Sequence, residues 1–445
     1  MNASFFIPMF AEIPVPRDLP LPLPLPEIAL KIVLVATFLV HILFVNLMVG
    51  GSFMVFALEL LGLKQPRFDA LAHKIAATVT VNKSMAVVMG IGPLLCINLL
   101  YTVQWYSANA LTGHAWLLII PSIIVAFLLT YLHKYTWERW AHGRAKHWHL
   151  ALGGLSALFF LFIPLVFLSN INLMLFPNEW EKVRGFLSSL LIGTVFPRHW
   201  HFMLASIALS GLFFVGWLGR KGATLDDIPG FTKPELRRLF YRAAFLATLG
   251  QFMVGPVVLL TLPAVGLSAQ LYKVIFTGVA IGLVVLALLR KEINRTDEKI
   301  GSLYVPIWIL FSVLVLSMGS GRHIYRETAL AGHKTQVQER TAEYQKALSA
   351  FNADLAARGG VEETGESLFA NCAACHAKDK VLVGPPLTEI AQIYKGNPDG
   401  IVTWAKGPGK KRPAMPPMPA MGHLGEANLH KIAEYMLSTG STSTP

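Results

Sequence analysis

The chain has 445 residues, of which 54% are hydrophobic and only 14% charged, and its mean hydropathy is +0.52. These values exclude an ordinary soluble globular protein, in which about 25% of residues are charged, and indicate a polytopic membrane protein surrounded by lipid. The net charge of +12 would indicate nucleic-acid binding in a soluble protein, but most Lys and Arg here lie between apolar runs. That pattern reports membrane topology, so we expect no nucleic-acid partner.

Residues 1–27 form a proline-rich N-terminal tail. The prolines between residues 14 and 26 preclude a helix, and no basic segment with a cleavage site precedes the first apolar run. We therefore expect no removable signal peptide and place this tail outside the membrane.

Residues 28–322 contain about eight apolar runs, each long enough to cross a bilayer as a helix. The predicted spans are 29–63, 84–104, 116–133, 150–176, 202–217, 243–263, 274–289 and 303–320. The fold class predicted is therefore all-α, a polytopic membrane helical bundle.

The loops between these spans differ in charge. Loops within 64–83, 134–146, 220–242 and 290–299 are rich in Lys and Arg, whereas the alternate loops and the tail carry only Arg17, Lys182, Arg184, Arg198 and Lys273. Basic loops stay on the cytoplasmic side, so both the N-terminus and the end of the eighth span are expected outside. We predict location in a bacterial inner membrane, with the C-terminal part on the periplasmic side.

Three segments of the bundle resemble the large subunit of cytochrome bd quinol oxidases. Residues 39–50 (LVHILFVNLMVG) are similar to the first span of that family, 201–211 (HFMLASIALSG) to its fifth, and 242–250 (RAAFLATLG) to its sixth. The resemblance implies that His41 ligates a haem, and that His201 binds the low-spin haem b.

The chain also departs from that family. Residues 116–132 contain no acidic residue where the family carries membrane-embedded glutamates, and residues 264–272 replace a long external quinol-binding loop. No methionine between 273 and 289 completes a low-spin haem. These departures argue against oxygen reduction.

Histidines inside the membrane need a polar partner, because an unpaired polar ring in lipid is costly. His41 either ligates haem b or bonds a neighbouring helix, and His201 is either a haem ligand or an interfacial residue. A second ligand could come from His323 or from Met253. Arg198 and Arg322 could meet haem propionates, or they could be rim residues at span ends. The remaining membrane-unit histidines, such as His133 and His149, lie near span ends and are expected to be interfacial.

Residues 323–360 are predicted to form a helical stalk or a solvated linker, since the segment is rich in Ala, Glu, Gln and Lys and ends in Gly359-Gly360.

Residues 361–445 contain the motif Cys372-x-x-Cys375-His376, which indicates covalent haem attachment. Two thiols at this spacing can each add to a haem vinyl group, and the adjacent imidazole can then face the iron. A buried thiol pair or half a zinc site is the alternative, but zinc needs two further soft ligands. The only other cysteine is Cys96, within an apolar run.

The segments around the motif resemble a small bacterial class I cytochrome c. The resemblance implies that a proline carbonyl, from Pro385 or Pro386, orients the His376 ring. It also implies that a methionine is the sixth iron ligand. Met418 is preferred because a closing helix is expected to begin about seven residues later, and Met415 and Met421 are the alternatives.

Three hypotheses for function follow. In the first, the bundle holds haem b and oxidises quinol, and the haem c passes single electrons to an external redox protein. In the second, the bundle lacks haem b and is an anchor and relay subunit among further respiratory subunits. In the third, which the departures disfavour, the chain is a bd-like terminal oxidase. Basic residues of the C-terminal domain would attract an acidic redox partner, and these are Lys378, Lys380, Lys395, Lys406, Lys410, Lys411 and Arg412.

Overall fold

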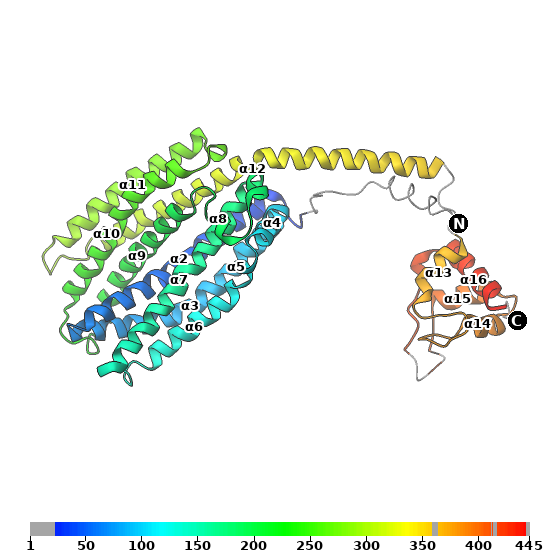
Figure 1. Cartoon of the computed structure of the whole chain (residues 1–445), viewed down its shortest axis with the longest axis horizontal. Helices are drawn as coiled ribbons and strands as arrows, with labels where there is room; N and C mark the ends of the chain where they lie inside the picture. The colour runs from blue at the N-terminus through cyan, green and yellow to red at the C-terminus, as the bar shows by residue number, and fades with distance from the viewer. Residues whose placement is uncertain (1–22, 358–363, 411, 413–415, 442–445) are drawn as a thin grey trace. The chain divides into compact units, whose positions relative to one another are not determined.

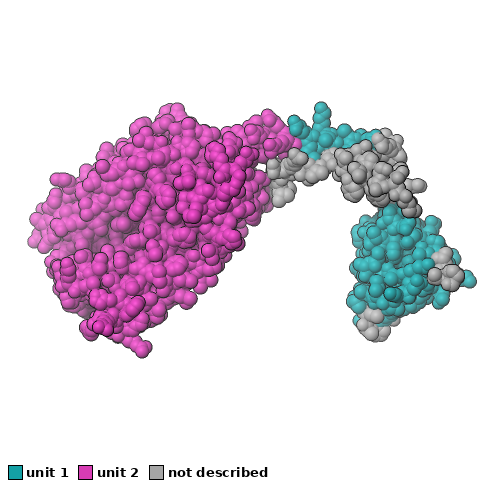
Figure 2. Space-filling view, in the orientation of Figure 1, with its two compact units in different colours: residues 1–15, 343–445 teal, residues 16–342 magenta. Residues whose placement is uncertain are grey.

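The structure is a computed structural model that describes residues 23–357, 364–410, 412 and 416–441. The chain divides into two compact units, one within Pro16–Ala342 and the other within Glu343–Pro445 (Figure 2). The described residues form α-helices and short 3-10 helices and contain no strand, which confirms the all-α fold class.

The first unit is a bundle of long helices (Figure 1). Eight helical segments among the described residues are long and apolar enough to cross a membrane, which confirms the expected number of spans. The elements of this unit are α2 (Glu27–Gly62), α3 (Pro66–Leu100), α4 (Thr102–Thr112), α5 (His114–Leu117), α6 (Ile119–Tyr135), α7 (Gly143–Leu175), η2 (Pro177–Lys182), α8 (Phe186–Ser189), α9 (Val195–Gly219), α10 (Lys233–Thr261), η3 (Ala264–Gly266), α11 (Ala269–Ile293) and α12 (Tyr304–Ala357).

Helix α9 is the central helix of the bundle. Its most apolar window is 61% buried, whereas the corresponding windows of the other spans are 17–33% buried and present most of their apolar side chains outward. It lies between α2 and α10 and packs against both (Figure 1). The outward side chains suit a lipid environment, because lipid tails are as apolar as leucine.

Small residues allow α2 and α9 to approach closely. A Cβ at Gly50 would overlap the backbone carbonyl of Ser206. Beside this contact, the Ser206 hydroxyl donates to Asn46 Oδ1 at 3.0 Å, and the Ser210 hydroxyl donates to the Asn46 carbonyl at 3.2 Å. Glycine packing and interhelical hydrogen bonds thus hold these two helices together, as is common in membrane bundles.

Helix α12 joins the last span to the predicted stalk without a break. It begins at Tyr304 and continues to Ala357, through the position where we place the boundary between span and stalk. The boundaries 1–27, 28–322, 323–360 and 361–445 remain predictions.

The second unit contains four short helices packed around one core. These are α13 (Gly365–Ala373), α14 (Leu387–Ile393), α15 (Pro398–Lys406) and α16 (Glu426–Ser441), with the 3-10 turn η4 (Gly422–Leu424). Helix α16 packs against the other three helices, and its Leu429 and Ala433 are buried with Leu368, Ile390 and Val402. The core is therefore organised around the C-terminal helix.

The contact between α2 and α9 is testable by substitution. We expect Gly50→Ala to lower the stability of the bundle by about 1–3 kcal/mol, the usual cost of forcing an extra carbon into a packed site. The thermal midpoint of the detergent-solubilised protein measures this. Gly332→Ala in α12 is the matched control, since a Cβ there meets no atom within 4 Å. Equal midpoints for the two variants would contradict the close packing.

Candidate haem c site and membrane cavity

The motif Cys372-x-x-Cys375-His376 lies at the end of α13. The helix begins after Thr364, whose hydroxyl accepts a hydrogen bond from the backbone of Ser367. The backbone amides of Cys375 and His376 both donate to the Cys372 carbonyl at 3.0 Å. This tight turn brings the two thiols and the imidazole into one short segment, as attachment of a haem at two neighbouring vinyl groups requires.

The His376 ring is held in one orientation. Its Nδ1 lies 2.8 Å from the Pro385 carbonyl oxygen, and the residue is only 8% exposed. A carbonyl can only accept, so Nδ1 carries the proton and Nε2 keeps a lone pair for a metal. A Cβ at Gly384 would overlap this ring, so the chain passes directly against the imidazole.

The two thiols are half-buried and unpaired. Burial raises the pKa of the Cys372 thiol, and the neighbouring Cys375 raises it further. The third cysteine, Cys96, is buried in α3 of the other unit. Two thiols and an imidazole with a bare Nε2 fit a covalent haem c, and the described residues of this unit contain no third cysteine that could complete a zinc site.

Two of the three candidate methionines lie in the described residues. Met418 and Met421 are half-buried and pack against the same apolar cluster as Cys372 and Phe369. The Met421 amide donates to the Ala405 carbonyl at 2.8 Å, which ties this segment to α15. Met415 lies outside the described residues. Met418 remains the predicted ligand, and Met415 and Met421 remain the alternatives.

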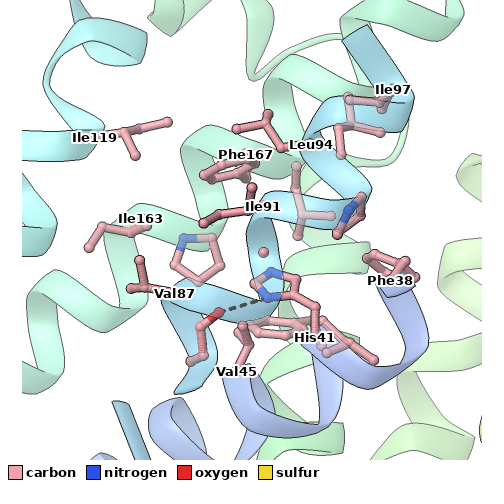
Figure 3. A pocket seen from close by; sticks show the side chains of 18 of the residues that line it. Phe38, His41, Val45, Val87, Ile91, Leu94, Ile97, Ile119, Ile163 and Phe167 are labelled. Carbon is pink, nitrogen blue, oxygen red and sulfur yellow. Dashed lines mark hydrogen bonds between the residues drawn. The ribbon is translucent and has the colours of Figure 1, made fainter. Parts of the chain in front are cut away.

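The membrane unit contains a cavity of about 490 Å³. Its wall is mostly apolar and comes chiefly from α2, α3, α6, α7 and α12, with single residues from α4, α5 and α9. The polar side chains on it belong to His41, Arg322, His323 and Arg326, besides the indoles of two tryptophans. The His41 ring projects among residues such as Phe38 and Ile91 (Figure 3). Its Nδ1 lies 2.9 Å from the Ala86 carbonyl oxygen, so Nδ1 carries the proton and Nε2 is bare.

The structure brings only some of the predicted haem b residues together. Arg322 and His323 line the same cavity as His41, and the Arg322 guanidinium lies 4.7 Å from the centre of the Phe38 ring. His201 is not among the described residues that line it, although its neighbour Phe202 is.

Two other candidates lie elsewhere. Met253 is 72% exposed on α10. Arg198 Nη1 donates to Asn172 Oδ1 at 3.5 Å. Neither is on the wall of the cavity that His41 lines.

Residues 362–440 match the cytochrome c family. The same part of the chain is 35% identical over 81 residues to cytochrome c-551 of Azotobacter vinelandii, an alignment that covers 17% of this chain and 98% of that protein. Through its C-terminal domain, the chain belongs to the cytochrome c family. The cytochrome c domain supports a covalent haem c as cofactor and electron transfer as its function.

The membrane unit is similar to a different protein. The structure of bd oxidase from Geobacillus thermodenitrificans superposes with a TM-score of 0.54 and 13% sequence identity, covering 74% of this chain and 97% of that one. The likeness shows that the bundle has the bd oxidase fold. The chain is therefore a cytochrome c domain fused to a bd-like, multi-pass membrane bundle.

Two groups of polar residues were missed from the sequence. Arg326 lies one helical turn after Arg322, so both arginines are on one face of α12. This spacing was the signal in the sequence that could have identified Arg326 as a candidate. His133 and His149, expected to be interfacial, are 4% and 0% exposed, and both contact Glu59. Glu59 is the only acidic residue in the apolar run 29–63, and that isolation was the available signal.

The close passage of Gly384 over His376 is testable in the cytochrome c domain. We expect Gly384→Ala to push the ring away from the Pro385 carbonyl, to lower the yield of haem-loaded protein and to reduce the stability of this domain by about 1–3 kcal/mol. Haem absorbance per chain and the thermal midpoint measure the two effects. Gly407→Ala, where a Cβ meets no atom within 4 Å, is the control. A Gly384→Ala protein as stable and as fully loaded as the control would contradict this role.

Proposed function

We propose that the protein is a membrane-bound c-type cytochrome that moves electrons between a haem b or quinol site in its bundle and an external redox protein. The observation that carries this proposal is the cavity in the bundle, where His41, His323, Arg322 and Arg326 face a mostly apolar space. A cytochrome c domain in the same chain supplies the acceptor or donor for that site.

The cavity supports an organic cofactor in size and chemistry. Its volume of about 490 Å³ lies within the range of roughly 300–1,000 Å³ typical of such sites. The Ala86 carbonyl holds the His41 ring with Nε2 available, while the cationic side chains of Arg322 and Arg326 can bind carboxylates of a haem or a quinol oxygen. A haem bound there would supply one-electron transfer, and the apolar wall would exclude water from it.

The cytochrome c domain offers a basic surface to a partner. Lys380, Lys395 and Lys410 are exposed, whereas Lys406 pairs with Glu426 at 2.7 Å and Arg412 pairs with Glu389. Lys411 lies outside the described residues. The exposed lysines support an acidic redox protein as the partner, with an encounter that salt weakens.

The charge of the loops supports the periplasmic side of a bacterial inner membrane for this domain. The Lys- and Arg-rich loops join α2 to α3, α6 to α7, α9 to α10 and α11 to α12. These four loops follow the first, third, fifth and seventh spans, so they lie on one side of the membrane, the cytoplasmic side by their charge. The eighth span ends on the other side, and the chain continues from there to the cytochrome c domain.

A second candidate function is an anchor and relay subunit without haem b in a larger respiratory complex. The bonding of His323 favours it: the Arg326 guanidinium only donates, so His323 Nδ1 accepts its hydrogen bond at 3.0 Å and the proton of a neutral ring is on Nε2. In this arrangement His323 offers no bare nitrogen to a metal. Oxygen reduction is the least supported function, since residues 116–132 contain no acidic residue.

Haem content distinguishes the two candidate functions. We expect pyridine haemochrome analysis of the purified chain to find haem b beside haem c, and we expect His41→Ala to lose most of the haem b while keeping haem c. The exposed His114 provides a matched control in His114→Ala. A haem b to haem c ratio near zero in the unmodified protein would leave only the anchor subunit.

The sixth ligand of the haem c is testable by a pair of variants. If Met418 sulfur binds the iron, Met418→Ala lowers the midpoint potential by an amount on the order of 100 mV, within the ≈0.8 V range that axial ligands span. Met421→Ala then leaves the potential nearly unchanged, because that side chain only packs. Potentiometric titration of both variants gives the answer: the reverse pattern would assign Met421, and unchanged potentials in both variants would assign Met415.

A further inference from the structure

A second polar cluster lies in the bundle, where the ends of α2 and α6 meet the start of α7. It contains Glu59 of α2, His133 of α6 and His149 of α7, whose side chains are 0%, 5% and 0% exposed. One ligand atom from each lies within 4.8 Å of the others. The consecutive helices α6 and α7, together with the distant helix α2, thus direct two imidazoles and a carboxylate at one point.

The contacts of His149 require a proton or a metal ion between this ring and Glu59. Its Nε2 lies 2.7 Å from the backbone carbonyl of His133, so Nε2 carries a proton. Its Nδ1 contacts Glu59 Oε1, which is also an acceptor. In the neutral ring this contact would set a lone pair against a carboxylate, which is repulsive unless a proton or a metal ion lies there.

The charges around Glu59 also favour binding of a cation. The Lys146 ammonium lies 2.7 Å from Glu59 Oε1 and 2.6 Å from Asp69 Oδ1, so one positive charge faces two carboxylates. With both histidines neutral, the cluster carries a net charge of −1. An unbalanced charge in a buried site is costly, and therefore the cluster attracts a further cation.

We propose that Glu59, His133 and His149 form a binding site for a divalent transition-metal ion of the zinc class. Two imidazoles and one carboxylate are a ligand set that zinc uses in proteins. The hydrogen bond from His149 Nε2–H to the His133 carbonyl has the form found behind metal-bound histidines, where it selects the ligating nitrogen.

A small cavity borders His133, although Glu59 and His149 do not line it. Its volume of about 20 Å³ is enough for one water molecule, and Ser52, Thr130 and Ser156 are among its lining residues. A Cβ at Gly153 would come within 2.8 Å of His133 Nε2, so glycine keeps the approach to this nitrogen open. Zinc in such a site takes a water as its remaining ligand.

Lys146 competes with the metal for Glu59. A divalent ion with two carboxylates is neutral, and the ammonium of Lys146 would add an unbalanced positive charge. Lys146 is the fourth residue of α7, beside the loop that precedes it, so its long side chain can turn away from Glu59. The site therefore binds metal more tightly when Lys146 is replaced by an uncharged residue of similar length.

The test uses the full haem-loaded chain in detergent, equilibrated by dialysis against graded ZnCl₂, with zinc per chain measured by mass spectrometry. We expect one zinc per chain. Loss of a hydrogen-bond partner of a metal ligand lowers metal affinity roughly 10- to 100-fold. Because Glu59 is itself a proposed ligand, we expect Glu59→Gln to lower the zinc affinity by more than this. Lys146→Met should strengthen binding at pH 7. A gain in affinity cannot result from misfolding, so this variant tests the proposal even if Glu59→Gln is unstable.

Two controls identify other sources of zinc. His147→Gln removes an exposed histidine on the same turn of α7, and it should leave binding unchanged. A Cys372→Ser, Cys375→Ser protein excludes zinc held by cysteines without haem. Zinc binding that is equal in the unmodified, Glu59→Gln and Lys146→Met proteins would overturn the proposal. So would the absence of zinc from both the unmodified and the Lys146→Met proteins, which would assign the cation at His149 to a proton.

Discussion

Polar side chains buried in the bundle must find partners on neighbouring helices, because lipid offers none. This constraint accounts for many of the specific contacts of the membrane unit. Lys31 of α2 donates to Glu327 of α12 at 2.6 Å, and Tyr101, which follows α3, also contacts Glu327. Asn46 and Ser206 join α2 to α9 in the same way. Apolar packing brings the helices together, and these pairs select which helices meet and in what register.

The same constraint separates two chemistries at the two ends of the bundle. Towards the start of α2 and the end of α3, the cavity gathers arginines and His41 and suits an anionic or redox-active organic group. Towards the opposite end, Glu59 and Asp69 set carboxylates against His133, His149 and Lys146, and this cluster suits a cation. With its histidines neutral, the cluster around Glu59 has a net negative charge, which the proposed metal ion would offset.

In the cytochrome c domain, close backbone contacts have the role that polar pairs have in the bundle. Gly384 lets the chain run against the His376 ring, and the next residue, Pro385, supplies the carbonyl that holds Nδ1. These contacts fix the orientation of the ring. A donor that is already oriented loses little freedom on ligation, which favours a stable iron–nitrogen bond.

Local spacing and composition by themselves determined much of this protein. The eight spans can be read from the length of their apolar runs. The motif Cys372-x-x-Cys375-His376 can be read in the same way, because the attachment that it predicts needs only residues within one turn. Tertiary structure alone decided which distant residues meet. It placed His323 and Arg326 on the wall of the cavity that His41 lines, and it kept His201 and Met253 off that wall. It also joined Glu59 to His133 and His149 across 74 and 90 residues. Helical periodicity tells which face of a helix a side chain occupies. Which helix that face contacts depends on how the helices pack, and no short stretch of sequence encodes that packing when the helix surfaces are nearly uniformly apolar.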